Sequence, residues 1–288
     1  MRVAVFGAGG YIGRYLMARL RLAGEDAISY SSATGNVFDA RTGILAESVE
    51  IPAGTECVIY LAQSPFYRQM PEMASHLWGV NVVSALKTAD LARRCGAKRF
   101  IYASTGNVYS PSFSPLLEGS PLRRDDWYAL SKVHAEEGLA LYRNDLSVTA
   151  ARIFGAYGPR QTGRMVPRMV EAIRSGVTIK LAPNPHDVGD QGGLRVSLCY
   201  IDDVVEIIFR LIRETAPNAI NVAGPEPFSV RKIALAIGAQ LGITPQFEVA
   251  SQHREFDLIA DVTKLVETLN PKFSHFSDGI ANTVEKLN

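Results

Sequence analysis

Short apolar runs alternate with amphipathic stretches through the first two hundred residues of the chain. A continuous apolar run such as "VAVF", residues 3–6, is typical of a parallel strand that is buried on both of its faces. Similar runs, bounded by polar or turn residues, recur along this part of the chain, and we interpret each of them as a strand. The predicted strands are 3–6, 27–32, 36–40, 57–63, 99–104 and 147–154.

The stretches between these strands carry apolar residues at the spacing of an α-helix. Ile12, Leu16 and Leu20 recur one turn apart, and Gly24 stands where it would end the helix. Further helices are predicted over about 73–95 and 125–137. This alternation predicts an α/β fold, with a parallel sheet covered by helices on both faces and a central strand order of 3-2-1-4-5-6.

Composition and charge narrow the class of protein. The chain has 288 residues, of which 47% are hydrophobic, so it can bury a large core, and its net charge is only +1. No basic patch or long apolar run stands out, and the first strand leaves no room for a signal peptide. We therefore expect a cytoplasmic protein that binds neither nucleic acid nor membranes, with reduced cysteines and no metal site.

Three glycines lie directly between the first strand and the first helix. Gly7, Gly10 and Gly13 would allow a sharp turn, a close approach of the backbone to a pyrophosphate, and tight packing of the helix on the strand. The N–H groups at the start of that helix would face the anion. This placement predicts a Rossmann-type, doubly wound sheet that binds a dinucleotide.

The less regular last third of the chain predicts a second unit. Helices are expected near 165–176, 202–214 and 230–242, with strands at 178–182, 195–201 and 218–224. We assign residues 1–157 plus 199–223 to the dinucleotide-binding domain. Residues 158–198 plus 224–288 are predicted to form a smaller, C-terminal substrate-binding lobe.

The second predicted strand bears on the choice of cofactor. Folds of this type that select NAD usually end this strand in a carboxylate that holds the ribose hydroxyls. Here the strand ends in Ser31 and Ser32, which can donate to a 2′-phosphate, and Arg14 is near enough in sequence to help neutralise it. Both NAD and NADP therefore stay open as cofactors.

A tyrosine and a lysine lie one helical turn apart in "DDWYALSKVHAEE". These are Tyr128 and Lys132, and Thr105 is predicted just beyond the carboxyl end of a central strand, where open α/β sheets bind ligands. A phenol titrates near pH 10, which is about three units too high for a base at neutral pH. A nearby ammonium group favours phenolate, so Lys132 is expected to lower the pKa of Tyr128. The three groups predict a proton acceptor placed over a carbon that gives a hydride to nicotinamide.

Several segments together carry a resemblance to a known family. They are the glycine turn, "VFDA", "VIYLAQ", "YASTGNVYS", "YALSK", "RIFGAYGPRQ", "YIDDVVEII" and "HREFDLIADVTK". The chain resembles the extended short-chain dehydrogenases/reductases, of the nucleotide-sugar, NAD-dependent epimerase/dehydratase family. The resemblance implies a catalytic triad of Thr105, Tyr128 and Lys132, the last also holding the cofactor, and it suggests a homodimer built through a four-helix bundle.

The remaining site residues are also expectations from that resemblance and from residue chemistry. Those for the cofactor are Gly7, Gly10, Tyr11, Ile12, Gly13, Ser31, Ser32, Asp39, Ala40, Leu61 and Ala62. Those for the substrate are Asn107, Arg160, Arg195 and Arg254, because the planar guanidinium of arginine binds phosphate oxygens in pairs.

Three departures from the family pattern affect the expected chemistry. The dehydratases place Asp and Glu directly after the catalytic Thr, but Gly106 and Asn107 stand here and cannot exchange a proton. Gly155 replaces a frequent Asn, and Tyr60 replaces a frequent His. We favour a nucleotide-sugar epimerase, with an NADPH-dependent reductase of a keto-sugar or other carbonyl as the alternative and a dinucleotide-sensing regulator as a third hypothesis.

Overall fold

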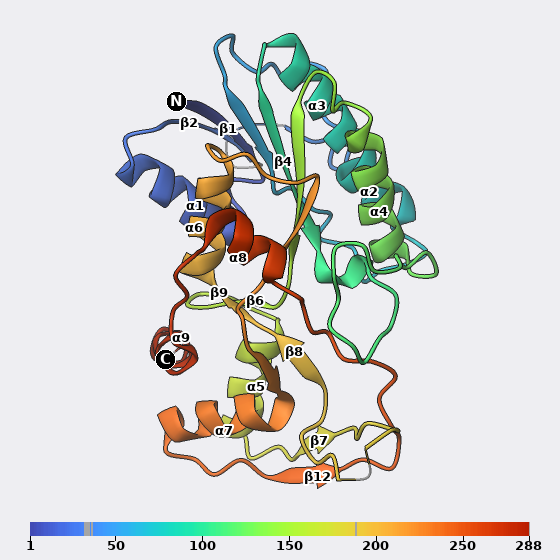
Figure 1. Cartoon of the computed structure of the whole chain (residues 1–288), viewed down its shortest axis with the longest axis vertical. Helices are drawn as coiled ribbons and strands as arrows, with labels where there is room; N and C mark the ends of the chain where they lie inside the picture. Colours follow the sequence, from blue (N-terminus) through green and yellow to red (C-terminus); the bar gives the residue numbers. More distant parts are fainter. Residues whose placement is uncertain (32–34, 36, 188, 288) are drawn as a thin grey trace.

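A twisted parallel sheet with helices on both faces forms the larger part of the molecule (Figure 1). The computed structural model describes residues 1–31, 35, 37–187 and 189–287. Within these residues the sheet has six strands in the order β10-β5-β4-β3-β1-β2, and every pairing is parallel. The strands are β1 (Arg2–Phe6), β2 (Asp26–Tyr30), β3 (Cys57–Tyr60), β4 (Arg99–Thr105), β5 (Ser147–Ile153) and β10 (Ala219–Val222).

Alternate residues of the central strands supply the cores on the two faces of this sheet. Val3 and Val5 of β1 face one core, whereas Ala4 and Phe6 face the other, because successive side chains of a strand point to opposite sides. The first core is covered by α1 (Tyr11–Leu22), α6 (Ile201–Leu211) and, beside β10, α8 (Thr263–Leu269). The predicted α/β class and doubly wound sheet are thereby confirmed.

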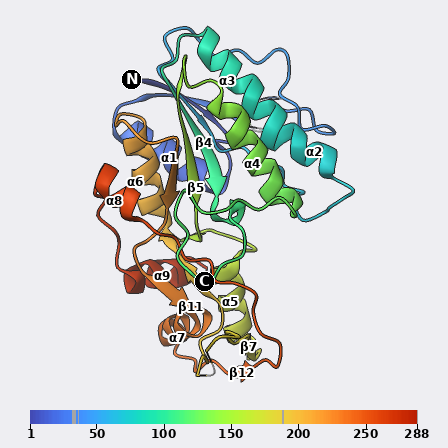
Figure 2. The same cartoon turned by 45° about the vertical axis from the view of Figure 1, so that its right-hand side comes forward.

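The second face is covered by a long, nearly continuous helical region and by the helix that carries Tyr128 (Figure 2). The region consists of α2 (Ala74–Trp78), a π-helical turn η1 (Gly79–Val83) and α3 (Ser84–Arg94). Beside it lies α4 (Trp127–Ala140), whose first turn is capped by the Asp126 carboxylate accepting from the Ala129 N–H at 2.8 Å. This cap fixes where α4 begins, and hence the height of Tyr128 above the sheet.

The remaining elements gather at the end of the sheet where its strands terminate (Figure 1). They include three two-stranded sheets, formed by β6 with β9, β8 with β11 and β7 with β12, which are separate from the six-stranded sheet. Their bounds are β6 (Ala156–Tyr157), β7 (Ile179–Leu181), β8 (Arg195–Ser197), β9 (Cys199–Tyr200), β11 (Pro227–Ser229) and β12 (Phe247–Val249). The helices here are α5 (Met165–Arg174), α7 (Val230–Leu241) and α9 (Phe276–Glu285), and the proposed division into two domains stays a prediction.

One predicted strand is wrong for the residues that the structure describes. Asn36 lies outside them, and over 37–40 only Phe38 makes a single bridge, to Leu45. The cause is a turn: the Asp39 carboxylate accepts from the N–H groups of Arg41 and Thr42 at 3.1 and 2.7 Å. The backbone is thus turned back instead of extended. The predicted order is otherwise correct, and β10 takes the opposite edge of the sheet.

Among the helices of the described residues, none combines the length and the apolar character that a bilayer crossing requires.

Candidate active site

The glycine turn has the geometry that dinucleotide binding requires. Gly7 has φ +84°, a conformation that side chains disfavour, and a Cβ there would lie 2.6 Å from the Ala62 backbone nitrogen. A Cβ on Gly13 would lie 2.3 Å from the Gly7 carbonyl oxygen, so only glycine lets α1 pack this closely on β1. Gly10 is the N-cap of α1 and leaves the free N–H groups of its first turn open to an anion. The residues present therefore fit a dinucleotide pyrophosphate.

The other predicted cofactor residues surround this turn. Tyr11 and Ile12 begin α1, Leu61 and Ala62 follow β3, and Ser31 is buried directly after β2. Ser32 lies outside the described residues. Asp39 and Ala40 are exposed in the turn that replaces the expected strand, and the hydrogen bonds from Thr42 hold the pKa of the Asp39 carboxyl below its ordinary value.

The structure brings Thr105, Tyr128 and Lys132 together at the end of β4. The Tyr128 hydroxyl donates to the Gln63 side-chain oxygen at 3.0 Å, and the Thr105 side chain lies near enough to act on the pKa of the phenol in the lowering direction. One turn further along α4, the Lys132 Nζ donates to the Ala103 carbonyl at 2.8 Å. Gln63 follows Ala62, which lies against the Gly7 backbone, so residues 62 and 63 link the glycine turn to the phenol.

The pKa of Tyr128 is shifted in the opposite direction to the one that we expected from the neighbouring Lys132. Burial raises the pKa of Tyr128 to about 12, although Thr105 and Arg164 act in the lowering direction. Burial also lowers the pKa of Lys132 to about 7, because an ammonium group loses its hydration there. The prediction that Lys132 depresses the pKa of Tyr128 is therefore wrong for this structure. Its amine points to β4, and burial weakens its hold on a proton.

A buried ion pair lies one helical turn beyond Lys132. Glu136, one turn after Lys132 on α4, binds Arg152 of β5 with a shortest N–O distance of 2.6 Å, and both side chains are at most 8% exposed. Ser104 donates to the same carboxylate, and Arg152 also donates to the Tyr109 hydroxyl at 2.9 Å. These bonds tie α4 to β4 and β5, so the positions of Tyr128 and Lys132 relative to Thr105 are set by a fully partnered network.

Three residues near the phenol were missed by the sequence analysis. Gln63 contacts the Tyr128 hydroxyl, and the Tyr67 ring lies 5.2 Å from the Tyr128 ring. Arg164, the N-cap residue of α5, donates to the Tyr67 hydroxyl at 2.6 Å. The only local signal was the position of Gln63 just after a buried strand, at the edge where parallel sheets bind ligands.

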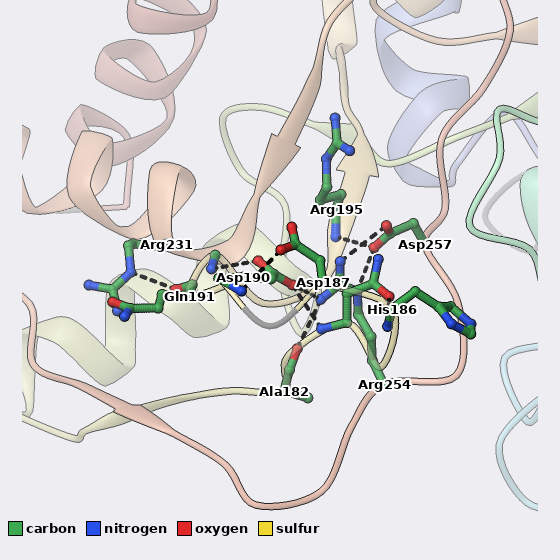
Figure 3. Close-up of polar contacts among 12 residues, drawn as sticks. Ala182, His186, Asp187, Asp190, Gln191, Arg195, Arg231, Arg254 and Asp257 are labelled. Atoms are coloured by element: carbon green, nitrogen blue, oxygen red, sulfur yellow. Dashed lines mark hydrogen bonds and ion pairs between the residues drawn. The ribbon is translucent and has the colours of Figure 1, made fainter.

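The predicted substrate residues lie in different environments. Asn107 and Arg160 are exposed, and Arg160 has a left-handed backbone with φ +61°, which is rare outside glycine. Arg195 is exposed as well, and its side chain extends away from the cluster around Arg254 (Figure 3). The Asn107 backbone N–H donates to the Thr105 hydroxyl at 3.2 Å, which helps to orient that side chain.

Arg254 is buried between two carboxylates (Figure 3). Its Nε donates to Asp257 at 2.7 Å, and one terminal nitrogen binds Asp190 and the Ala182 carbonyl. Asp190 also accepts from the N–H groups of Asn184 and Gly192 at 2.9 Å each. In this structure the guanidinium thus joins Ala182, Asp190 and Asp257, and it does not present a free cation to solvent.

Known proteins resemble the chain over most of its length. The family model described as NAD dependent epimerase/dehydratase family matches residues 3–223. A UDP-glucose 4-epimerase of Mycolicibacterium smegmatis is 28% identical, over 99% of this chain and 98% of its own length. A UDP-glucuronic acid decarboxylase of Arabidopsis thaliana is also 28% identical, over 81% of this chain and 72% of its own.

The fold has solved counterparts too. The crystal structure of a Thermus thermophilus UDP-glucose 4-epimerase in complex with NAD has a TM-score of 0.77 and 22% identity, and it covers 100% of this chain and 99% of that one. The extent of the family match, together with the glycine turn and the Thr105–Tyr128–Lys132 cluster, places the chain in the NAD dependent epimerase/dehydratase family.

Proposed function

We propose that this protein is an NAD-dependent epimerase of nucleotide-sugars. The observation that carries the proposal is the Tyr128 hydroxyl, which lies beside Thr105 and donates to Gln63, the residue after the Ala62 that packs on the glycine turn. The relationship to a UDP-glucose 4-epimerase over nearly the whole of both chains supports the choice of substrate class.

Each residue has a role that follows from its chemistry. A nicotinamide cofactor, held with its pyrophosphate at the glycine turn, would supply an acceptor for hydride from a sugar carbinol carbon and a donor that returns this hydride to the opposite face of the keto-sugar. Tyr128 accepts the proton of the sugar hydroxyl and gives it back, and Thr105 holds the reacting oxygen in line. Lys132 binds ribose hydroxyls of the cofactor. Gly106 and Asn107, which follow Thr105, cannot act as the acid and base that removal of water from the sugar would need.

NAD is the cofactor that we infer. Solved structures of this fold contain it, among them the Thermus thermophilus enzyme. An epimerase needs no distinction between NAD and NADP pools, because it returns the hydride that it takes. The serine at position 31 lacks the carboxylate that would hold the ribose hydroxyls, so an assay of NADP in parallel with NAD tests this choice. Action in the cytoplasm stays a prediction from the sequence.

The arginines are proposed for the substrate diphosphate. Arg160 and Arg195 are exposed, and among the described residues no carboxylate forms a salt bridge with either side chain, which suits both to phosphate oxygens. Arg254 forms salt bridges with Asp190 and Asp257, so it could bind the diphosphate only if it released one of these carboxylates. The negative charge of the diphosphate would then take the place of the released carboxylate.

The cofactor balance separates this proposal from its alternative. The protein is incubated with UDP-glucose, UDP-galactose and their uronic acid and N-acetyl forms, and the products are separated by chromatography. We expect the two members of one 4-epimer pair to be interconverted. Absorbance at the NAD(P)H band should show no net change while the sugar is converted. Stoichiometric loss of NADPH with a keto-sugar would instead establish the reductase, and the absence of both reactions would overturn the assignment.

Self-association through α3 and α4 is a second expectation. Exposed apolar side chains lie at the two ends of α4, namely Trp127 at 47% and the C-cap residue Leu141 at 79% exposure, and such a helix can pair with its copy across a two-fold axis. Light scattering at micromolar concentration should give the mass of a dimer. Leu141→Glu is expected to weaken the dimer at least about tenfold, since it places charge in an apolar contact. Leu22→Glu, equally exposed but on α1, should leave it intact, and a monomeric parent protein would refute the model.

A further inference from the structure

Gln63 makes a direct contact with the group that transfers the proton. Its side-chain oxygen accepts from the Tyr128 hydroxyl at 3.0 Å, the distance of an ordinary hydrogen bond. Gln63 is the third residue after β3, and the preceding Ala62 is 7% exposed and packed against the backbone of Gly7. The amide therefore lies between the glycine turn and the phenol.

The backbone on both sides of this contact is anchored. The Ser64 N–H donates to the Asn81 side-chain oxygen at 3.2 Å, and the Asn81 amide donates to the Ser131 hydroxyl at 3.0 Å. Ser131 in turn donates to the Tyr128 carbonyl at 2.8 Å. The two linking side chains, of Asn81 and Ser131, are completely buried, as is Ser64. This chain of bonds returns from the neighbour of Gln63 to Tyr128 itself, so the separation of the two side chains is built into the fold.

An amide differs from other hydrogen-bonding groups in a way that matters for a proton carrier. A phenol donates one hydrogen bond, whereas a phenolate can only accept. The oxygen of a glutamine amide accepts from the first, and its NH₂ donates to the second after a half turn about the last side-chain bond. Gln63 can thus remain bonded to the Tyr128 oxygen before and after the proton moves, with no proton gained or lost by the amide.

We propose that Gln63 is a positioning residue that partners the Tyr128 oxygen in both of its protonation states and so balances proton uptake against proton return. The proposal rests on the epimerase function, in which Tyr128 must take a proton in one half of the cycle and return it in the other. A partner that can only accept a hydrogen bond would stabilise the phenol and slow proton uptake. A partner that can only donate would stabilise the phenolate and slow proton return.

Other groups near the phenol also influence the pKa of Tyr128. Burial is the main cause that raises the pKa of Tyr128, with Thr105 and Arg164 opposing it and with Tyr67 and Asp126 raising it further. Tyr102 of β4 and Lys132 on the same helix lie nearby, and Lys132 is over the Tyr102 ring at 4.7 Å. Substitutions at position 63 leave all of these groups in place.

Replacement of the amide by a carboxylate tests the proposal. In Gln63→Glu the side chain keeps its length but can no longer donate, and its negative charge disfavours phenolate, so the pKa of Tyr128 rises. The acidic limb of the pH profile of kcat/KM should move up by about one unit, which is about a tenfold loss at neutral pH that is regained at higher pH. Gln69→Glu, exposed on the same segment, adds the same charge without the contact and should leave the limb unchanged.

A second variant and a second readout separate this role from simple packing. Gln63→Met keeps the volume and removes both bonding modes, so kcat should fall about tenfold or more at every pH, with little change in KM and in the thermal midpoint. The tyrosinate absorbance of Tyr128, isolated as the difference between each protein and its Tyr128→Phe counterpart, should titrate at higher pH in Gln63→Glu. This titration needs no turnover, so it tests Gln63 even if the substrate assignment fails. An unmoved titration in folded Gln63→Glu, or wild-type kcat in Gln63→Met, would overturn the proposal.

Discussion

Tyr128→Phe is expected to lower the turnover of the true substrate by about 10²–10⁴-fold, the range typical for loss of a positioned acid–base group. The substitution removes only the hydroxyl that meets Thr105 and Gln63, and it leaves the ring against Tyr67. Since the proton of the sugar hydroxyl then has no acceptor, the oxidation step should be slowed and the binding steps should not.

Binding and folding provide the controls for this variant. The thermal midpoint and the affinity for NAD should stay close to those of the parent protein, because neither the glycine turn nor Lys132 is altered. A kcat reduction with little change in KM would locate the loss in the chemical step. If the variant turns over the substrate at the parent rate, Tyr128 is not the proton acceptor and the proposed mechanism is wrong.

Lys132→Met is expected to abolish most turnover while making the protein more stable near pH 7. The lysine is 2% exposed, and burial lowers its pKa to about 7 from the ordinary 10.5. Between these values the unfolded chain binds more protons than the folded one, so the stability of the parent protein rises with pH through this window. Methionine carries no such penalty, and we expect a gain of about 1–3 kcal/mol at pH 7 after the lost bond to Ala103 is counted.

Denaturant unfolding at pH 7 and pH 10 measures this effect. The difference in the free energy of unfolding between variant and parent should shrink as the pH rises towards 10.5, because the lysine of the unfolded parent chain then begins to lose its proton as well. Calorimetry should also show weaker NAD binding, since Lys132 is assigned to the ribose hydroxyls. A variant that is less stable at pH 7, or a difference that does not change with pH, would contradict the burial argument. The trade of stability for activity is common at functional sites.

The amino-acid sequence by itself determined the architecture of the parallel sheet and the helices that cover it. The apolar run 3–6, the three glycines and the helical spacing after them are local patterns, and local patterns are enough to specify strands, turns and helices. The spacing of Tyr128 and Lys132 likewise predicted one helical face, because residues four apart lie one above the other on a helix. Their contact with β4, through Thr105 and Ala103, followed from the rule that ligands bind at the carboxyl ends of parallel strands.

Only the tertiary structure decided which groups meet across the chain. Asp190 and Arg254 are 64 residues apart, Gln63 and Tyr128 are 65 apart, and no periodicity relates the members of either pair. The direction of the pKa of Tyr128 was also beyond the sequence, because it depends on how deeply the phenol is buried and where the Lys132 amine points. Burial and long-range contacts arise when the elements pack, whereas sequence patterns describe the elements one at a time.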